Sequence, residues 1–539
     1  MREKLRAYVR LVALAGSVAL LPPTAASSAE IQLSLRGGGG FQIKGELQSF
    51  DGRKYIIINP SFGRMEVDAR RFECVGSTCP TAPVRANLSP GPVFNPARPA
   101  QISIAGSNTV GNQLMPAIIK AYAQKMNLRV EQVSQPSPLD LIFHFKDANG
   151  REVAKIDLAR HGSSTSFRGL QSGQAQIGMS SRPIKDAEVA SLAALGNMRA
   201  VTHEHILGLD GLLILVSPSN PLISISISDV AKVFSGEITD WSQLGFEGGK
   251  INIYAPDEVS GTWETFQTLV LKPKNLTLVA SAKRTQNHAE QADWVAADPL
   301  GIGFVGMAYL RNAKPLNIEA TCGLITPPTN FSIKTEEYPF SRRLYLYTPG
   351  RPEQTLAGGL LDFALSQEAQ SIVSKADFID QAPEMISFAD QGSRVAYALN
   401  APEQDFNLEL MRAFLTELKE ADRLTYTFRF NTGAVTLDAK SVQDTKKLVD
   451  LMAGKDLKDK AIKLIGFADS GGAFENNLSL SLSRARAVRA ALLKAGEGRI
   501  NPSQVLVRGY GELAPVACNN SLESKAFNRR VEVWVDRNQ

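Results

Sequence analysis

The chain has 539 residues, of which 44% are hydrophobic and 21% are charged, a composition that is ordinary for globular protein. Its formal net charge of +5 is spread over this whole length and gives no case for nucleic-acid binding. At about 100–200 residues per domain, the length indicates three or four domains.

Residues 1–29 are predicted to be a secretory signal peptide. Basic residues precede an apolar stretch, 11–21, that is too short to span a bilayer. Small residues follow, and cleavage after Ala26 or Ala29 fits them. An uncleaved anchor is the alternative. No cysteine stands at the cleavage point, which argues against a lipoprotein.

The four cysteines predict disulfides, because an exported chain meets an oxidising compartment. Cys74 and Cys79 flank a short loop and are expected to form a local bridge. A bond between Cys322 and Cys518 would tie two domains together, and the sequence leaves this pairing open. A zinc site is the rival interpretation, but the cysteine spacing is poor and no histidine lies close to any of them.

Residues 30–80 are predicted to form a small β domain. Alternating strands flank Asp51-Gly52, which is a hairpin signal. Residues 80–99 contain six prolines, so 81–99 is expected to be a linker. Residues 100–385 alternate strand-like and helix-like runs, which indicates α/β layers. Residues 386–420 are predicted to be a connector ending in a helix, because apolar side chains from Leu408 to Leu418 recur at helical spacing.

Hydroxyl-rich turns punctuate the central region, and each stands where a helix is expected to begin. Such a turn offers backbone N–H groups and a hydroxyl, which can bind an oxyanion without a charged side chain. One turn alone is more often a simple helix cap. The turns are Gly106-Ser107-Asn108-Thr109-Val110-Gly111, Gly162-Ser163-Ser164-Thr165, Gly178-Met179-Ser180-Ser181-Arg182-Pro183 and Ser260-Gly261-Thr262.

These turns resemble those of the phosphate-binding proteins of bacterial ABC phosphate transporters, over about 100–380. Further landmarks are Asp210-Gly211, Phe234-Ser235-Gly236, Gly301-Ile302-Gly303-Phe304 and Tyr338-Pro339 with Ser341-Arg342. The resemblance implies a two-lobed type II periplasmic-binding-protein fold that closes on its ligand by a hinge. It also implies that the site is lined by Thr109, Val110, Ser163, Ser181, Ser260, Gly261 and Thr262.

Two positions depart from the family pattern. Many relatives carry an arginine where Pro256 stands, and some carry an aspartate at the position of Ser181. A serine cannot reproduce the selectivity of a carboxylate for a protonated anion. Arg182 or Arg168 could supply positive charge instead, although a solvated surface position is the ordinary place for an arginine. The sequence therefore predicts an oxyanion site without fixing phosphate as the ligand.

Residues 421–539 are predicted to alternate strands and helices, with one helix stopping at Gly496. This segment resembles the OmpA C-terminal family, which holds peptidoglycan non-covalently, and it implies an α/β sandwich. The matching motifs are Gly466-Phe467-Ala468-Asp469-Ser470-Gly471-Gly472, Asn477 to Ala485, Gly509-Tyr510-Gly511-Glu512 and Asn528-Arg529-Arg530-Val531-Glu532.

A peptidoglycan stem peptide carries a diamino acid with an ammonium and a carboxylate on one centre. Asp469 is predicted to bind the ammonium, and Arg484 to hold the carboxylate with its planar guanidinium. A plain surface ion pair is the alternative. Arg529 and Arg530 are expected to be structural, binding acidic groups within the domain.

No catalytic residue, metal site or cofactor is predicted. His203 and His205 alternate as on an exposed strand, where two histidines are usually just polar. His161 adjoins Ser163, but no nucleophile elbow or third triad member is evident.

The leading hypothesis is a periplasmic solute-binding protein for phosphate or a similar oxyanion, tethered to peptidoglycan near the outer membrane. An ABC permease or another envelope protein is a possible partner, and delivery to a transporter would need separate proteins. The alternative is a scaffolding envelope protein whose central domain no longer binds a ligand.

Overall fold

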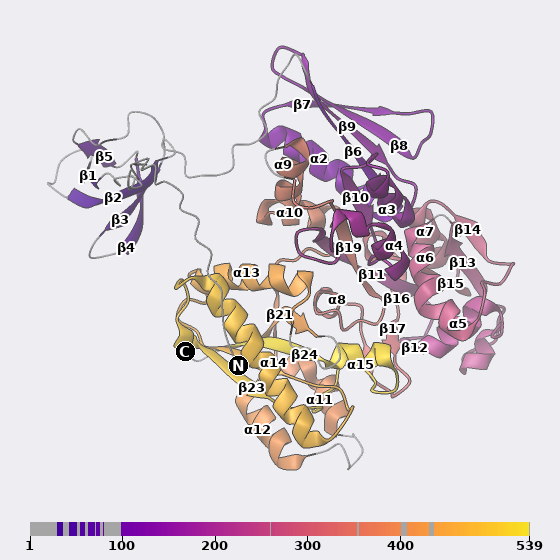
Figure 1. Cartoon of the computed structure of the whole chain (residues 1–539). Helices are drawn as coiled ribbons and strands as arrows, with labels where there is room; N and C mark the ends of the chain where they lie inside the picture. Colours follow the sequence, from indigo (N-terminus) through magenta and orange to yellow (C-terminus); the bar gives the residue numbers. More distant parts are fainter. Residues whose placement is uncertain are drawn as a thin grey trace, which may run out of the picture. The chain divides into compact units, whose positions relative to one another are not determined.

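The computed structural model describes residues 30–35, 42–50, 54–59, 63–69, 72–75, 79, 99–258, 260–352, 355–399, 407–430 and 436–537 (Figure 1). The chain divides into two compact units, Met1–Gly91 and Pro92–Gln539, which are described separately. The predicted signal peptide and residues 81–98 of the predicted linker lie outside the described residues. No helix in the described ranges is long and apolar enough to cross a membrane.

The N-terminal unit is one antiparallel sheet in the order β4-β3-β2-β1-β5. Its core is small and apolar, with Ile31, Leu33 and Ile57 at most 1% exposed. The Cys74–Cys79 disulfide links the last strand to Cys79 beyond its end, and very small cores are usually stabilised by such a bond. The predicted hairpin turn is outside the described residues. The strands are β1 (Glu30–Leu35), β2 (Gln42–Phe50), β3 (Lys54–Asn59), β4 (Gly63–Asp68) and β5 (Phe72–Val75).

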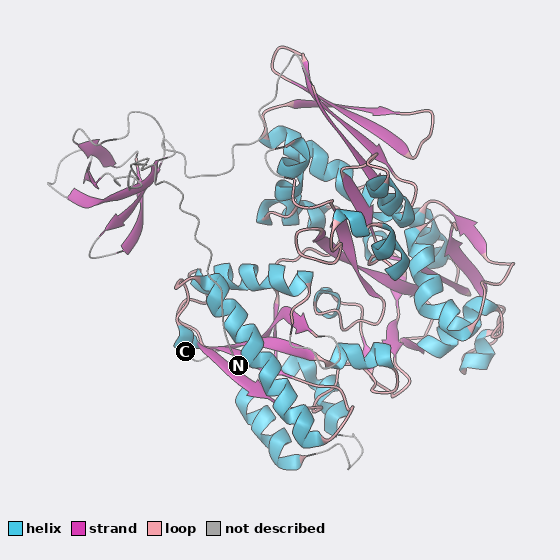
Figure 2. Cartoon of the chain, in the orientation of Figure 1, coloured by secondary structure: helices cyan, strands magenta, loops and turns pink. Residues whose placement is uncertain are grey.

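The second unit contains an eleven-stranded sheet shared by two lobes, with helices packed beside its strands (Figure 2). Strand β11 (Glu204–Val216) is buried along its whole length and belongs to both lobes. Its first half pairs with β19 (Ser341–Tyr347), and its second half pairs with β15 (Gly301–Gly306). These crossing strands are the connection about which two such lobes can move.

Lobe 1 places three parallel strands side by side in the order β10-β6-β9. Because parallel strands end at the same edge of a sheet, the loops that follow them lie together. Helix α1 (Asn108–Asn112) follows β6 (Ala100–Gly106), and α3 (Ser163–Gln171) follows β9 (Glu152–Ala159). Strand β10 (Ile177–Ser180) ends beside them at Ser181.

Lobe 2 has its own apolar core around stacked aromatic rings. Phe266 and Phe304 lie 3.9 Å apart between ring centroids, and Phe234 packs edge-on against both. Helix α6 (Gly261–Phe266) begins after β13 (Asn252–Pro256), so its N-terminus is fixed by this core. The two-lobed α/β fold that the resemblance implied is therefore confirmed.

The C-terminal domain is a five-stranded sheet in the order β20-β21-β24-β22-β23, with β22 parallel to β23. Two long helices, α13 (Ala439–Ala453) and α14 (Phe474–Gly496), pack against each other and on the sheet. Helix α14 ends at Gly496, as predicted. The strands are β20 (Met385–Ser387), β21 (Ala421–Arg429), β22 (Ile462–Gly466), β23 (Val505–Gly509) and β24 (Arg530–Asp536).

The sequence predicts residues 386–420 to be a connector, and the described parts of this segment, 386–399 and 407–420, pack on this domain. Strand β20 adds to its sheet, and α12 (Leu408–Leu418) is the helix expected from the periodicity. The apolar face of α12, centred on Phe414, packs against Phe467 and Trp534 in a second core. Periodicity predicts a helix and its apolar face but does not name the surface that the face covers.

Candidate functional sites

Four hydroxyl side chains gather at the edge of lobe 1 where the parallel strands end. Ser107, Thr109, Ser163 and Ser181 are each at most 4% exposed. The Oγ atom of Ser163 lies 3.3 Å from that of Ser181 and accepts a hydrogen bond from the Ser181 N–H at 3.2 Å. The structure thus brings together three segments that are separate in the chain, with Ser163 and Ser181 18 positions apart.

Lobe 2 meets this cluster with the N-terminus of α6. The Ser260 hydroxyl caps the helix by accepting from the Thr262 N–H at 3.1 Å. A Cβ atom at Gly261 would lie 2.6 Å from Ser181 Oγ and 3.1 Å from Thr109 Oγ1. Only a glycine lets the lobes approach this closely. The predicted residues of both lobes therefore face one another, and Val110 lies fully buried behind Thr109.

Three polar atoms at the start of α1 are buried without a hydrogen-bond partner. They are Ser107 Oγ, Asn108 Oδ1 and Thr109 Oγ1. Leaving a polar group buried and unsatisfied costs about 1–3 kcal/mol. The two hydroxyls can donate to an anion placed between the lobes, which would remove that penalty.

A buried ion pair between Arg342 and Asp210 contacts the N-terminus of α6. Arg342 on β19 binds Asp210 on β11 through Nε at 2.9 Å and Nη2 at 2.6 Å. The same guanidinium donates to the Gly261 carbonyl at 3.0 Å and to Thr262 Oγ1 at 3.1 Å. The crossing strands therefore hold the helix N-terminus directly. Asp210 and Arg342 were recognised in the sequence only as landmarks, since their pairing requires the sheet.

The sequence offers Arg182 and Arg168 as alternative sources of positive charge at this site. Arg182 is paired with Glu188 at 2.7 Å and with Glu264 at 3.0 Å. Arg168 lies exposed on α3. Pro256 ends β13, where it offers no cation. The anion-binding potential of the site therefore rests on hydroxyls and backbone N–H groups.

The histidines have individual partners. His205 is buried rather than exposed as predicted, because β11 runs inside the sheet, and its Nε2 lies 3.0 Å from Thr348 Oγ1. His161 pairs with Asp140 at 2.7 Å. His288 was not singled out, yet its Nε2 lies 3.0 Å from Ser260 Oγ. Burial, with the charge of Arg342, lowers the pKa of His288 to about 4, so its ring is neutral near pH 7.

The second candidate site lies at the end of β22. Asp469 accepts hydrogen bonds from the Gly471 N–H at 2.8 Å and from Arg529 Nη1 at 3.0 Å. Arg484 on α14 is fully buried, with its guanidinium 5.4 Å from the centre of the Phe430 ring. Burial and repulsion from Arg529 lower the pKa of Arg484 to about 10, although attraction by Asp469 opposes this shift. The guanidinium stays charged at neutral pH.

This arrangement places one carboxylate between cationic groups. Arg529, expected to bind an acidic group within the domain, has Asp469 itself as that group. Arg530 pairs with Glu532 at 2.6 Å in the interior. A ligand that carries an ammonium and a carboxylate on one centre could bind both signs of charge here.

The fold and the interlobe site define a two-lobed binding protein joined to a second α/β domain. The chain belongs to the PBP superfamily, whose domain model matches residues 96–368, and residues 429–529 match the OmpA family. A phosphate-binding protein of Borreliella burgdorferi is 26% identical over 247 residues, which is 44% of this chain and 84% of the relative. A phosphate-binding protein of Bacillus subtilis is 27% identical over 257 residues, 47% of this chain and 80% of the relative.

Solved structures are similar to each of these two domains. A substrate-binding protein of a putative phosphate ABC transporter from Clostridium perfringens, with bound phosphate, matches at 24% identity and a TM-score of 0.39. It covers 52% of this chain and 99% of that chain. The peptidoglycan-associated lipoprotein of Burkholderia pseudomallei matches at 25% identity and a TM-score of 0.19, covering 20% of this chain and 89% of that chain.

Proposed function

We propose that the chain is a periplasmic receptor for phosphate or a similar tetrahedral oxyanion, tethered non-covalently to peptidoglycan. The observation that carries the first part is the cluster of buried, unpartnered hydroxyls facing the N-terminus of α6 across the two lobes. Hydroxyls and N–H groups in this arrangement stabilise an anion without a counter-charge. The names of the curated relatives support phosphate as the first ligand to test.

The tether is supported by the site around Asp469 and Arg484. Its charges suit the ammonium and the carboxylate of a stem-peptide diamino acid, and the domain belongs to the OmpA family. A wall-bound receptor would hold its ligand site close to the outer membrane. An ABC permease supplied by separate proteins is the partner that would take the ligand onward.

A scaffolding protein without a ligand is the second candidate. One observation favours it: two arginines beside the interlobe site, Arg342 and Arg182, are both engaged by carboxylates. Neither is available to neutralise a bound anion. On this hypothesis the lobes are held closed by their own contacts and the domain serves other envelope proteins.

Isothermal titration of the dialysed mature protein with phosphate separates the two candidates. Micromolar or tighter binding that is lost in Ser260→Ala with Thr262→Ala would establish the receptor. Heat with sulfate or molybdate but not with phosphate would keep the fold assignment and change the ligand. No heat with any tetrahedral oxyanion would leave the scaffold as the function.

Wall binding has its own test in co-sedimentation with purified peptidoglycan. The mature protein should pellet with the wall, and the variant Asp469→Ala with Arg484→Ala should remain in the supernatant. Full co-sedimentation of that variant would show that the site is elsewhere.

A further inference from the structure

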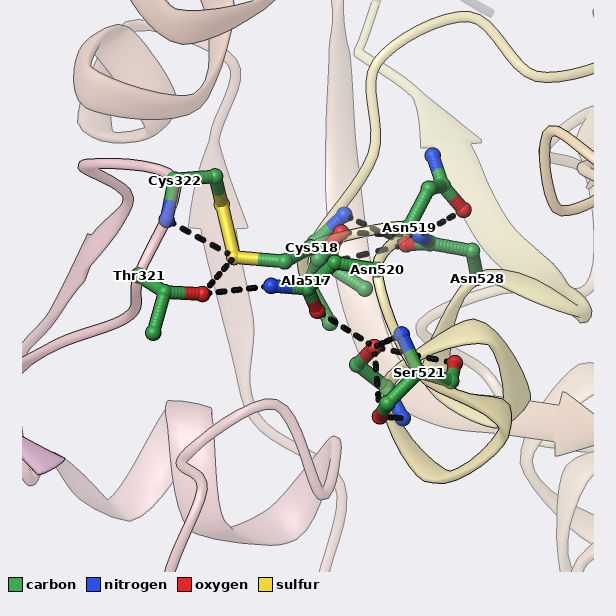
Figure 3. The surroundings of a disulfide bond; sticks show 10 residues. Thr321, Cys322, Ala517, Cys518, Asn519, Asn520, Ser521 and Asn528 are labelled. Atoms are coloured by element: carbon green, nitrogen blue, oxygen red, sulfur yellow. Dashed lines mark hydrogen bonds between the residues drawn. A yellow bond between two sulfur atoms is a disulfide. The ribbon is translucent and has the colours of Figure 1, made fainter. Parts of the chain in front are cut away.

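A disulfide joins the two domains beside the candidate wall-binding site (Figure 3). Cys322 lies in the loop between β17 (Asn317–Glu319) and β18 (Ile325–Thr326) of lobe 2, and Cys518 lies in the loop before α15 (Leu522–Asn528). The sulfur of Cys518 also accepts from the Cys322 N–H at 3.2 Å. Lobe 2 thus holds one loop of the C-terminal domain covalently.

The held loop reaches the segment that carries Asp469. The side-chain oxygen of Asn519, the residue after Cys518, accepts from the Ser470 N–H at 3.3 Å. The same oxygen accepts from Asn528 Nδ2 at 2.9 Å, which orients it (Figure 3). Asn519 therefore touches the backbone next to Asp469 while its neighbour in the chain is bonded to lobe 2.

Asn528 also holds the Cys518 loop through hydrogen bonds. It is fully buried and accepts through Oδ1 from the N–H groups of Val516 at 2.9 Å and Ala517 at 3.1 Å. The next residue, Arg529, binds Asp469. The loop is thus connected to the candidate site at two points, through Ser470 and through Arg529.

Lobe 2 adds a polar contact to the covalent one. Asn520 donates from Nδ2 to Thr321 Oγ1 at 2.5 Å, and Thr321 Oγ1 lies 3.8 Å from the sulfur of Cys518. Figure 3 shows these groups converging from the two domains on the disulfide. A displacement of the lobe 2 loop would therefore move Asn519 as well.

We propose that the peptidoglycan site is completed by the binding-protein-like domain, which fixes the Cys518 loop through the disulfide, and that Asn519 is the positioning residue of that site. The inference rests on the proposed wall binding and adds to it. Asn519 acts on the ligand through Ser470 and Asp469, not by direct contact. The affinity for the stem-peptide diamino acid then depends on a bond to another domain.

The test is titration of the mature full-length protein with a soluble stem tripeptide that contains meso-diaminopimelate. Asn519→Ala should weaken binding roughly 5-fold, the effect of one lost hydrogen bond to a binding loop. Asn519→Asp keeps an oxygen that accepts from Ser470 N–H and Asn528, so its affinity should stay within about twofold of the parent. A purely structural effect would instead lower the melting temperature of both variants alike.

A double-mutant cycle then tests the role of lobe 2. Cys322→Ser with Cys518→Ser should also weaken binding, and adding Asn519→Ala should cost little more, because both changes act through one contact. If the cysteine variant folds poorly, Asn520→Ala, which removes the hydrogen bond to Thr321 and leaves both disulfides intact, replaces it. If the parent binds and Asn519→Ala binds equally well, the role of Asn519 is overturned, while the proposed wall binding stands. Fully additive losses in the cycle would likewise overturn this inference alone. Absence of binding by the parent protein would overturn the proposed wall binding as well.

Discussion

At the residue scale, the interlobe site depends on a position without a side chain. Gly261 begins α6 and faces Ser181 and Thr109 of the other lobe. Its backbone is helical, so the requirement for glycine is one of space and not of conformation. The contact joins the two lobes, which makes the residue a specific probe of their closure.

We expect Gly261→Ala to weaken oxyanion binding roughly tenfold, because overpacking of this kind costs about 1–3 kcal/mol in the closed state. The open state has no such clash, so the melting temperature without ligand should fall little. Titration with phosphate measures the first effect and calorimetric melting the second. Gly392→Ala is the matched control, because a Cβ there meets no atom within 4 Å. Unchanged affinity in Gly261→Ala would mean that ligand binding does not bring the lobes together here.

His205 gives a pH-dependent prediction. Burial, with the charges of Arg351 and His203, lowers its pKa from 6.5 to about 4. As the pH falls from 6.5 to 4, His205 therefore binds a proton in the unfolded chain but stays neutral in the folded protein. Stability is fully present above pH 6.5 and is lost on acidification, by about 3 kcal/mol over this window.

The measurement is urea unfolding at pH 7.5 and pH 4.5, compared between the parent and His205→Gln. Glutamine does not titrate but can bond to Thr348, so the variant should lose roughly 2–3 kcal/mol less on acidification. Equal losses in the two proteins would show that His205 is protonated in the folded state.

At the scale of elements, the sequence predicts the turns of the interlobe site but not the tertiary contacts that bring them together. Each turn is local, with a hydroxyl at a helix start, and so can be recognised in the chain. Asp210 and Arg342 lie 132 positions apart and pair only because β11 and β19 are neighbours in the sheet. The same holds for His288 and Ser260, whose contact depends on the packing of lobe 2.

The segment 386–420 shows a second limit of the same kind. Its helix was predicted from spacing, and its membership of the C-terminal domain was not. Strand β20 is three residues long, too short for a periodic signal, and it pairs with β21 at the sheet edge. The surface that α12 packs on includes Phe467, Tyr510 and Trp534, all more than fifty positions after Phe414 in the chain.

Phe414→Ala tests whether α12 is part of that domain. Phe414 is 1% exposed and contacts Phe467 and Tyr510, so its removal should lower the free energy of unfolding by about 3–5 kcal/mol. Native-state hydrogen exchange at the amides of α12 and β24 measures it. Leu408→Ala, on the same helix but 49% exposed, is the control and should change stability by less than about 0.5 kcal/mol. Equal effects of the two changes would mean that α12 does not dock.

At the scale of the whole second unit, the binding-protein-like and C-terminal domains share buried charges as well as a disulfide. Glu337, just before β19, pairs with Arg423 of β21, and Arg423 lies 3.3 Å from Glu532 of β24. Burial alone would raise the pKa of Glu337, but the charge and hydrogen bonds of Arg423 hold it below its ordinary value. Both partners are therefore ionised at neutral pH inside the interface.

Glu337 balances part of the positive charge of a group of buried arginines in the C-terminal domain. Three buried arginines, Arg394, Arg423 and Arg530, surround the single carboxylate of Glu532. Glu337 supplies the second negative charge from the other domain. Because an uncompensated buried charge is expensive, a C-terminal domain separated from its partner would carry excess positive charge in its interior.

We therefore expect Glu337→Ala, a change in the binding-protein-like domain, to destabilise the C-terminal domain by about 3 kcal/mol. Glu337→Gln keeps the acceptor oxygen without the charge and should give an intermediate loss. Native-state hydrogen exchange at the amides of β24 reports on the C-terminal domain, and Glu409→Ala on the exposed face of α12 is the surface control. If Glu337→Ala behaves like the control, the C-terminal domain does not depend on this ion pair for its stability. A loss of the expected size would mean that the wall-binding domain needs the receptor domain for its own stability.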